Sequence, residues 1–259
     1  MATVQTLYSG SSGNCTLIRD SGTALLIDMG KSCKATLSAL YTAGVSAKDI
    51  SGILVTHEHS DHIAGLGIFL KYYPVPLFGP EAVLEYLFDA GLIPDCDLIE
   101  VEPGVEVMLG GLTFTPFRTS HDSLDCFGYR FLFENGRSAA IATDLGCMQA
   151  DVMEQLSGCA FVGLESNYDR FMLRVGRYPP YLKRRIASDR GHLSNDDCAV
   201  AFAELALRGT EKFTLMHLSE ENNAPDIALT ACLGALENNG RECPVEVAPR
   251  HGVGMAIEV

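Results

Sequence analysis

The chain has 259 residues, enough for one large domain or two small ones with a sizeable core. Hydrophobic residues make up 47% of it and charged residues 20%, which excludes a disordered chain. The net charge of −14 argues against a protein that coats nucleic acid non-specifically, and no apolar run approaches the ~20 residues that a membrane helix needs.

Short strands are predicted for the first third of the chain, where apolar and β-branched segments are separated by Gly and Ser. The expected strands are Thr3–Tyr8, Cys15–Arg19 and Ala24–Met29. An amphipathic helix is expected over about Lys31–Ala43. The apolar run Gly52–Thr56 stops abruptly at a group of histidines, as a buried strand would, and a helix is expected to follow over about His62–Tyr72.

Strands and helices alternate over the rest of the chain. Further strands are expected at Val75–Phe78, Leu98–Val101, Leu112–Phe117, Gly128–Glu134, Ala139–Thr143, Ala160–Glu165, Phe213–Met216, Val245–Ala248 and Met255–Val259. Helices are expected at about Pro80–Ala90, Ala150–Leu156, Asn195–Leu207 and Pro225–Asn238. Ser194, followed by acidic residues, is a good cap for the helix that begins at Asn195. This order predicts an α/β fold of two sheets with helices outside, in one domain over residues 1–259.

The nine cysteines are scattered from Cys15 to Cys243, and none forms a Cys-x-x-Cys pair. A secreted disulfide framework is denser and has an even number of cysteines. The N-terminus also lacks the basic and apolar regions of a signal peptide. We therefore expect reduced, mostly buried thiols in a cytoplasmic protein that does not associate with a membrane.

Three of the seven histidines lie within the six residues His57-Glu58-His59-Ser60-Asp61-His62. Alternate residues of an extended segment point the same way, so His57 and His59 can bind one ion, while a turn into a helix brings Asp61 and His62 to a second. Imidazole nitrogens and carboxylate oxygens without thiolate suit zinc or manganese, or iron, in a site open to water. A polar surface loop is the alternative, and the concentration of histidines argues against it.

The H-x-H-x-D-H pattern resembles the signature of the metallo-β-lactamase superfamily, and the rest of the chain is similar to it in order. His121, Asp144 and His217 each follow an apolar run that is predicted to be a strand. The resemblance implies a four-layer αββα sandwich with two divalent metal ions at one edge between the sheets. It assigns His57, His59 and His121 to the first ion, Asp61, His62 and His217 to the second, and Asp144 to a bridge between them. Taken alone, each later histidine is more often structural.

Glu165 and His192 resemble residues of the phosphodiesterase branch of the superfamily, represented by the tRNA 3′-processing endonuclease. There, such a histidine is oriented by such a carboxylate and protonates the leaving oxygen, while a hydroxide bridged by the two metals attacks phosphorus. Catalytic roles are therefore expected for His192, Glu165 and Asp61. The alternative is that His192 is a helix-start residue and Glu165 a carboxylate at a buried strand end.

The chain is most similar to a small bacterial family, YycJ, also called WalJ. The stretches that carry this likeness are Ser12–Cys15, Thr56–His62, Thr143–Gly146, Glu165–Asp169, Gly191–Asn195 and His217–Asn223. The resemblance implies a cytoplasmic exonuclease that digests duplex DNA from 5′ to 3′, with a suggested link to mismatch repair. Tyr168 stands where many members carry a histidine, which puts any ligand or proton-transfer role at that position in doubt.

Spacing narrows the choice among relatives. The 23 positions from His121 to Asp144 leave no room for the arm with which the tRNA-processing enzymes clamp tRNA. The stretch from Asp144 to His217 similarly lacks the large extra domain of the RNA-cleaving relatives. Thioester hydrolases of the superfamily carry the same ligands, so a small-molecule thioester or phosphodiester hydrolase remains the alternative. A non-catalytic DNA-binding or metal-sensing module is less consistent with an intact ligand set.

Two further segments have a phosphate-binding interpretation. Residues 170–190 carry seven basic residues against one acidic residue, and we expect the basic ones to position DNA through its backbone. The expected contacts are Arg174, Arg177, Lys183, Arg184 and Arg185, with an ordinary solvated face as the alternative. The turn Tyr8–Asn14 could form a nest of backbone amides for a phosphate, but a hairpin turn is the simpler interpretation.

Overall fold

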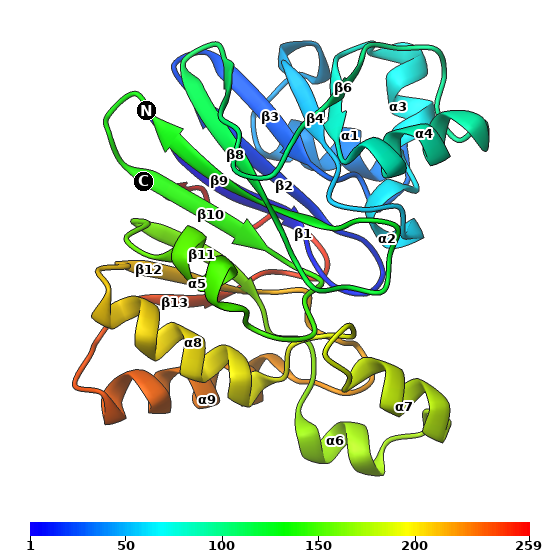
Figure 1. The fold of residues 1–259 in the computed structure, drawn as a ribbon. Helices are drawn as coiled ribbons and strands as arrows, with labels where there is room; N and C mark the ends of the chain where they lie inside the picture. Colours follow the sequence, from blue (N-terminus) through cyan, green and yellow to red (C-terminus); the bar gives the residue numbers. More distant parts are fainter.

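The protein is a sandwich of two seven-stranded sheets, described for residues 1–259 by a computed structural model (Figure 1). The first sheet has the strand order β14-β1-β2-β3-β4-β5-β6. Its strands are β1 (Thr3–Tyr8), β2 (Cys15–Asp20), β3 (Thr23–Ile27), β4 (Gly52–Leu54), β5 (Leu77–Gly79), β6 (Leu98–Glu100) and β14 (Ile257–Glu258). Strands β1, β2 and β3 are antiparallel, whereas β3 to β6 run parallel.

The second sheet has the order β13-β12-β11-β10-β9-β8-β7. Its strands are β7 (Val107–Leu109), β8 (Leu112–Arg118), β9 (Phe127–Phe133), β10 (Ser138–Ala142), β11 (Phe161–Glu165), β12 (Lys212–Met216) and β13 (Val245–Val247). Strands β7 to β10 are antiparallel and β10 to β13 are parallel. Each sheet therefore contains four neighbouring parallel strands, and the carboxyl ends of those strands lie at one edge.

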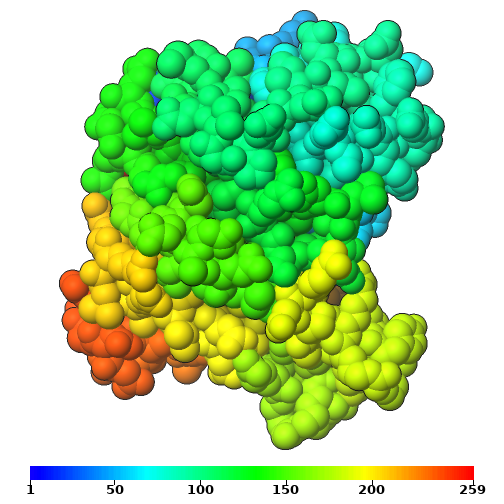
Figure 2. All heavy atoms as spheres, viewed as in Figure 1, coloured from blue at the N-terminus to red at the C-terminus, as the bar shows by residue number.

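Helices cover the outer face of each sheet. The first sheet carries α1 (Cys33–Thr42), α3 (Leu66–Tyr72) and α4 (Glu81–Asp89), with the short helices η1 (Ala47–Asp49) and α2 (Ser60–Ile63) beside them. The second sheet carries α5 (Ala150–Leu156), α8 (Asn195–Leu207) and α9 (Pro225–Asn238). Two more helices, α6 (Arg170–Val175) and α7 (Pro180–Ile186), form a hairpin that projects from one corner of the molecule (Figure 2). No helix has the length and apolar character needed to cross a membrane.

The core consists of three apolar layers, because neighbouring residues of a strand point to opposite faces. In β3, Leu25 packs between the sheets and Leu26 packs under the helices of the first sheet. In β11, Phe161 packs between the sheets and Val162 packs under the helices of the second. Strands buried on both faces explain the continuous apolar runs of the sequence, and the αββα architecture is confirmed.

The structure departs from the sequence-based expectations at several places. Neither strand β7 nor the short helix η1 was expected, and two larger differences concern helices. The single helix expected over His62–Tyr72 is wrong: Gly65 separates α2 from α3. The Gly65 amide donates to Met29 O at 2.9 Å, and a side chain at Gly65 would place its Cβ 2.2 Å from Lys31 O. This close approach of the loop before α1 interrupts the helix. The basic segment 170–190, for which no element was expected, contains α6 and α7.

Candidate metal centre

Polar side chains gather where the parallel strands of both sheets end. Asp28 follows β3 and His57 lies three residues beyond β4, while in the second sheet Asp144 and His217 follow β10 and β12, and Glu165 ends β11. The carboxyl ends of parallel strands are the usual place for ligand-binding groups, because the chain leaves the sheet there. All five residues are buried, so the cluster lies inside the edge of the sandwich and not on its surface.

Three of these residues have a left-handed backbone. Asp28, Asp144 and His217 have φ values of 60°, 57° and 55°, and they are three of the four non-glycine residues with positive φ in the chain. Such a conformation costs about 1–3 kcal/mol per residue, and it persists only where the surroundings hold it. The His217 amide, for example, donates to Ser9 Oγ at 2.8 Å. Three strained residues at one site indicate that the unusual backbone conformation is needed to place the side chains of Asp28, Asp144 and His217 in the cluster.

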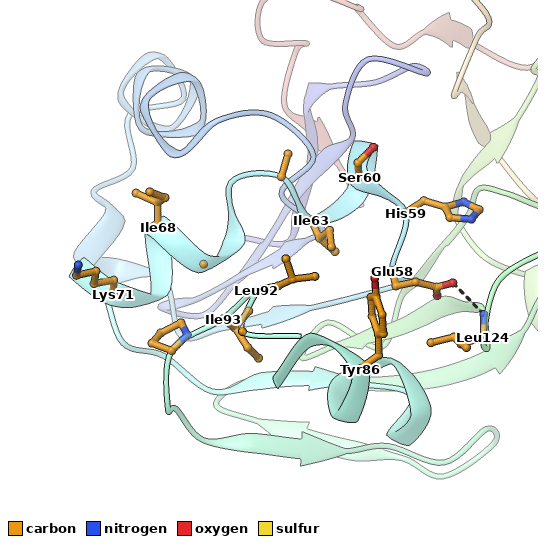
Figure 3. Close-up of a pocket in the computed structure, with 14 residues that line it drawn as sticks. Glu58, His59, Ser60, Ile63, Ile68, Lys71, Tyr86, Leu92, Ile93 and Leu124 are labelled. Atoms are coloured by element: carbon orange, nitrogen blue, oxygen red, sulfur yellow. Dashed lines mark hydrogen bonds between the residues drawn. The ribbon is translucent and has the colours of Figure 1, made fainter. Parts of the chain in front are cut away.

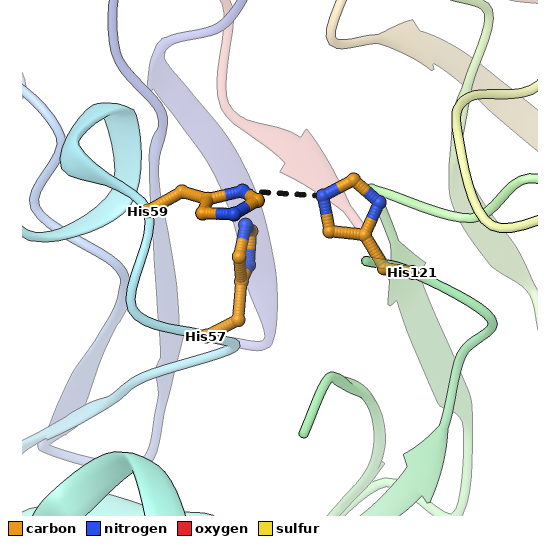
Figure 4. Close-up of side chains that lie close together, drawn as sticks. All are labelled: His57, His59 and His121. Atoms are coloured by element: carbon orange, nitrogen blue, oxygen red, sulfur yellow. Dashed lines mark hydrogen bonds between the residues drawn. The ribbon is translucent and has the colours of Figure 1, made fainter. Parts of the chain in front are cut away.

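The first group of potential ligands is His57, His59 and His121 (Figure 4), whose ligating nitrogens lie within 4.8 Å of one another. His121 Nδ1 donates to Gly191 O at 2.9 Å, so its Nε2 carries the lone pair, and this Nε2 lies 3.2 Å from His59 Nδ1. His57 Nε2 is buried and has no hydrogen-bond partner. Burial lowers the pKa of His57 well below its usual value and also lowers that of His121. Two neutral imidazoles and His59 therefore face a common point.

The second group is Asp61, His62 and His217, which also lie within 4.8 Å of one another through their ligating atoms. His217 Nε2 is 3.2 Å from Asp61 Oδ2, and His217 Nδ1 donates to Glu165 at 2.8 Å. His62 Nδ1 donates to Asp28 at 2.7 Å, which leaves Nε2 to face the cluster. Each histidine is thus held through Nδ1 and presents Nε2.

Asp144 lies between the two groups. Its Oδ2 is 3.1 Å from His62 Nε2 but has no hydrogen bond, and its Oδ1 is 3.7 Å from both His121 Nε2 and His217 Nδ1. Burial raises the pKa of Asp144, but His217 and His62 outweigh it and hold that pKa well below its usual value. An ionised carboxylate with an unsatisfied buried oxygen is placed to contact an ion in either group.

The donor set fits divalent metal ions. It combines imidazole nitrogen with carboxylate oxygen and contains no thiolate, as in metal sites that keep a position open for water. Buried polar atoms are rarely left without a partner, yet His57 Nε2 and Asp144 Oδ2 both are. A bound cation would satisfy both atoms. Of the seven residues that the sequence assigned to metal binding, six lie in these two groups and Asp144 lies between them; their role as ligands remains a prediction.

Glu165 and His192 form a second feature beside the two groups. The Glu165 side chain is fully buried; its Oε2 accepts from the amides of Leu145 at 3.0 Å and Leu193 at 3.1 Å. Its Oε1 accepts from His192 Nδ1 at 2.7 Å and from His217 Nδ1 at 2.8 Å. Burial lowers the pKa of His192, but the Glu165 carboxylate outweighs it and raises that pKa above its usual value. His192 can therefore carry a proton on Nε2.

Sequence reasoning missed Asp28, which holds one histidine of each group. Asp28 accepts from His62 Nδ1 and from the Thr56 hydroxyl at 2.9 Å, and Thr56 Oγ1 in turn lies 2.9 Å from His57 Nδ1. The only trace of this role in the sequence is an acidic residue inside the apolar run Ala24–Met29. A buried carboxylate behind metal-binding histidines fixes their orientation and tautomer.

A buried hydrogen-bond network joins three of the stretches that carry the family likeness, Glu165–Asp169, Gly191–Asn195 and His217–Asn223. Ser166 Oγ donates to Asn195 Oδ1 at 2.7 Å, and Asn195 and Asn223 exchange two amide hydrogen bonds of 2.9 Å. Asn167 Nδ2 donates to His217 O at 2.9 Å. The network fixes the loops that carry Glu165, His192 and His217. The sequence motifs contain these asparagines, but they do not reveal that the side chains bond to one another and hold the loops together.

The remaining candidate positions are structural in this arrangement. Tyr168 is buried with Leu173 and Ile186 at the base of the α6–α7 hairpin. In the turn before β2, Asn14 Oδ1 accepts from Gly10 N at 2.9 Å, and the Asn14 amide donates to Asp61 O at 2.8 Å. This supports the hairpin-turn interpretation and ties the turn to a potential metal ligand.

The basic residues of the α6–α7 hairpin divide into two kinds. Lys183 donates to Arg174 O and Gly176 O at 2.8 and 2.6 Å, which links the two helices. Arg185 forms an ion pair with Asp122, the neighbour of His121, and so attaches the hairpin beside the first group. Arg174, Arg177 and Arg184 are exposed, without an ion pair, and remain free to contact a ligand.

Comparison with known proteins gives a consistent result. The family model for the β-lactamase superfamily domain matches residues 23–218. The chain is 37% identical over 98% of its length to the exodeoxyribonuclease YycJ of Bacillus anthracis, of which it covers 92%. It is 36% identical over 86% of its length to the exodeoxyribonuclease WalJ of Streptococcus pneumoniae, of which it covers 83%. Among solved structures, the metallo-β-lactamase fold protein YhfI of Bacillus subtilis aligns over 100% of both chains with a TM-score of 0.78 and 18% identity, a likeness of fold.

Replacing Asp28 with Asn is expected to weaken metal binding about 10–100-fold. Asp28 accepts from His62 Nδ1 and Thr56 Oγ1 on Oδ2 and from Thr56 N on Oδ1, whereas an amide has one acceptor oxygen and would turn an NH2 group toward one of these donors. The orientation of His62 and, through Thr56, of His57 would then be lost. Competition with a fluorescent chelator measures the affinity. Asp89→Asn, at an exposed helix end, is the matched control. Equal affinities of the two variants would contradict the role of Asp28.

Metal affinity is expected to rise with pH. Burial lowers the pKa of His217, but Asp144, Asp61 and Glu165 together raise it to about 10, so the metal-free site is protonated at neutral pH. A ligand must lose that proton to bind a metal, so binding releases protons and strengthens as the pH rises toward that value. Calorimetry in two buffers with different heats of ionisation, between about pH 6 and pH 9, measures the release. The same heat in both buffers, with an affinity independent of pH, would count against this charge state.

Proposed function

The chain belongs to the β-lactamase superfamily and, within it, to the family of the exodeoxyribonucleases YycJ and WalJ, and we propose that it is a metal-dependent exodeoxyribonuclease. The observation that carries the proposal is the Glu165–His192 pair, which contacts His217 of the second group and lies beside His121 of the first, with ring centroids 5.2 Å apart. Such a pair is a proton donor held in a defined orientation, which phosphodiester hydrolysis needs for its leaving oxygen.

We propose that two divalent ions, zinc or manganese and alternatively iron, bind to the two groups. His57, His59 and His121 would hold one ion, Asp61, His62 and His217 the other, and Asp144 both. Bound there, such ions supply Lewis acidity, which makes water a nucleophile at neutral pH and offsets charge on phosphoryl oxygens.

The protein's own contribution is orientation and proton transfer. Glu165 accepts the Nδ1 proton of His192, which directs the proton on Nε2 outward, where 18% of the side chain is exposed. His192 would donate that proton to the leaving oxygen of the cleaved phosphodiester. The two backbone amides on Glu165 Oε2 keep the carboxylate ionised and in place while the histidine changes its charge. Asp61 would position the attacking water together with His217.

DNA would approach over the α6–α7 hairpin. The exposed cations Arg174, Arg177 and Arg184 can contact phosphates, with Arg185 and Lys183 fixing the hairpin beside the site. Backbone contacts of this kind tolerate any sequence and weaken with salt. Digestion from 5′ to 3′ is the polarity that the family resemblance implies.

The alternative is a small-molecule hydrolase on the same site. Thioester hydrolysis releases a thiolate, which leaves without prior protonation far more readily than an alkoxide does. A positioned proton donor such as His192 therefore favours cleavage of an oxygen ester, and the phosphodiester interpretation is the better supported.

The metal-loaded protein is expected to shorten duplex DNA, and Asp144→Ala is expected to abolish this. Removal of Asp144 takes away the one carboxylate between both groups, so activity and most of the bound metal should be lost. Duplexes labelled at the 5′ or the 3′ end, with Mn²⁺ or Zn²⁺, give the polarity: digestion from the 5′ end releases a labelled mononucleotide from the first and a ladder from the second.

Asp89→Asn serves as the control for this experiment. No shortening by protein with verified metal occupancy would reject the exonuclease in favour of the small-molecule hydrolase.

His192→Gln is expected to slow DNA cleavage by about 10²–10⁴. Hydrolysis of bis-p-nitrophenyl phosphate should fall far less, because p-nitrophenolate leaves without a proton. Metal content, measured by atomic emission, should stay unchanged, since His192 belongs to neither group assigned to an ion. Equal losses on both substrates would show that His192 acts on the architecture of the site and does not donate a proton.

A further inference from the structure

A cavity of about 950 Å³ lies beside the first group of histidines (Figure 3). Its walls come from α2, α3, α4 and the segment 91–94 that follows α4. Gly67 makes this arrangement possible, because a Cβ there would lie 2.1 Å from Leu92 O. The volume lies near the upper end of the range of about 300–1,000 Å³ that small-molecule and cofactor pockets span.

The cavity opens directly on the metal-binding side chains. His59, whose Nδ1 lies 3.2 Å from His121 Nε2, lines one end of it. Glu58 lies beside His59, and its carboxylate accepts from the Leu124 amide at 3.0 Å, which holds the segment that follows His121 against the cavity rim. A ligand in the cavity would therefore adjoin any group bound at the first group of histidines.

Seven of the 14 residues that line the cavity are hydrophobic, and several of these are exposed. Ile68 and Leu124 are 57% and 55% exposed, and Tyr86 and Leu92 are each 44% exposed. In Figure 3, Ile63 and Leu92 occupy the middle of the wall and the ring of Tyr86 stands beside them. Exposed apolar side chains gathered around one hollow mark a binding surface, and an aromatic ring among them suits a flat, aromatic ligand.

The far end of the cavity carries a cation. Lys71 lies at the opposite end from His59 and is exposed, with no carboxylate in contact (Figure 3). Its ammonium group is therefore available to a phosphate at this end of the cavity. In a polynucleotide strand, each nucleoside lies between two phosphates. The cavity has the same order: His59 at one end beside the proposed metal site, an apolar wall that can contact a base, and Lys71 at the other end, where a second phosphate can bind.

We propose that this cavity holds the unpaired nucleotide at the end of the DNA strand, with its base on the apolar wall and its outer phosphate toward Lys71. The proposal rests on the proposed exonuclease activity and specifies its substrate. A base in this cavity cannot remain paired or stacked in a duplex, so the end must fray before it is cleaved. The apolar wall offsets part of the cost of unpairing by covering the face of the base.

The cavity and the α6–α7 hairpin lie on either side of the metal-binding side chains. Figure 1 shows α3 and α4 on one side of α2 and the hairpin on the other, at the same end of the sandwich. A strand could thus run from Arg174 and Arg184 past the metals and end in the cavity. A single bound DNA strand would thus account for both the exposed arginines of the α6–α7 hairpin and the apolar cavity.

Calorimetric titration of thymidine monophosphate and of inorganic phosphate into the metal-loaded protein tests the proposal. Both probes carry the phosphate, and only the nucleotide can use the apolar wall, so thymidine monophosphate should bind at least tenfold more tightly. In Leu92→Glu this advantage should fall to about twofold or less, because a carboxylate replaces apolar wall. Ile68→Glu, a second exposed position, should do the same.

Leu233→Glu is the matched control, because Leu233 is 45% exposed on α9, away from the cavity. It should keep the full advantage of the nucleotide. Equal binding of both probes by the unaltered protein, or an unchanged advantage in both cavity variants, would overturn the proposal. A nucleotide advantage that depends on Leu92 in a protein that shortens no DNA would support the cavity and reject the exonuclease, so the two failures are distinguishable.

Discussion

The burial of charge at one edge of the sandwich is the constraint on which the rest of the site depends. Imidazoles and carboxylates lose favourable hydration when they leave water, so they are stable inside a protein only when each has a partner. Here four histidines are held through Nδ1: His57 by Thr56, His62 by Asp28, His121 by a backbone carbonyl and His217 by Glu165. These tethers direct the Nε2 atoms of the held histidines inward, toward the places where an ion would bind. The cluster thus gathers buried carboxylates and imidazoles at one place, where a divalent cation would take the position of protons on the histidines.

The left-handed residues follow from the same constraint. A chain that leaves a strand in a relaxed conformation carries its next side chain away from the sheet edge. Asp28, Asp144 and His217 adopt positive φ, and hydrogen bonds from neighbouring loops hold them there. The geometry of the site therefore lowers the stability of the fold somewhat, as expected where function and stability compete.

The sequence predicted the architecture well because both sheets follow simple local rules. Continuous apolar runs indicated strands buried on both faces, and polar residues at the ends of those runs marked the edge that holds the site. Ser194 correctly marked the start of α8, since a cap acts through neighbouring residues alone. Asp28 and the break at Gly65 could not be predicted in this way. Both depend on contacts with segments distant in the chain, and neither leaves a periodic pattern.

Glu165 Oε1 receives hydrogen bonds from both His192 and His217, and this sharing limits how the enzyme can evolve. A substitution that changes the pKa of His192 or His217 changes its hydrogen bond to Glu165 Oε1, and through that oxygen it also changes the hydrogen bond of the other histidine. Under the proposed roles of His192 and His217, the preference for a particular ion and the readiness to release a proton would therefore change together. Lineages that drift toward a different metal should change residues 165, 192 and 217 in concert, with strong epistasis among the three and few viable single-step intermediates.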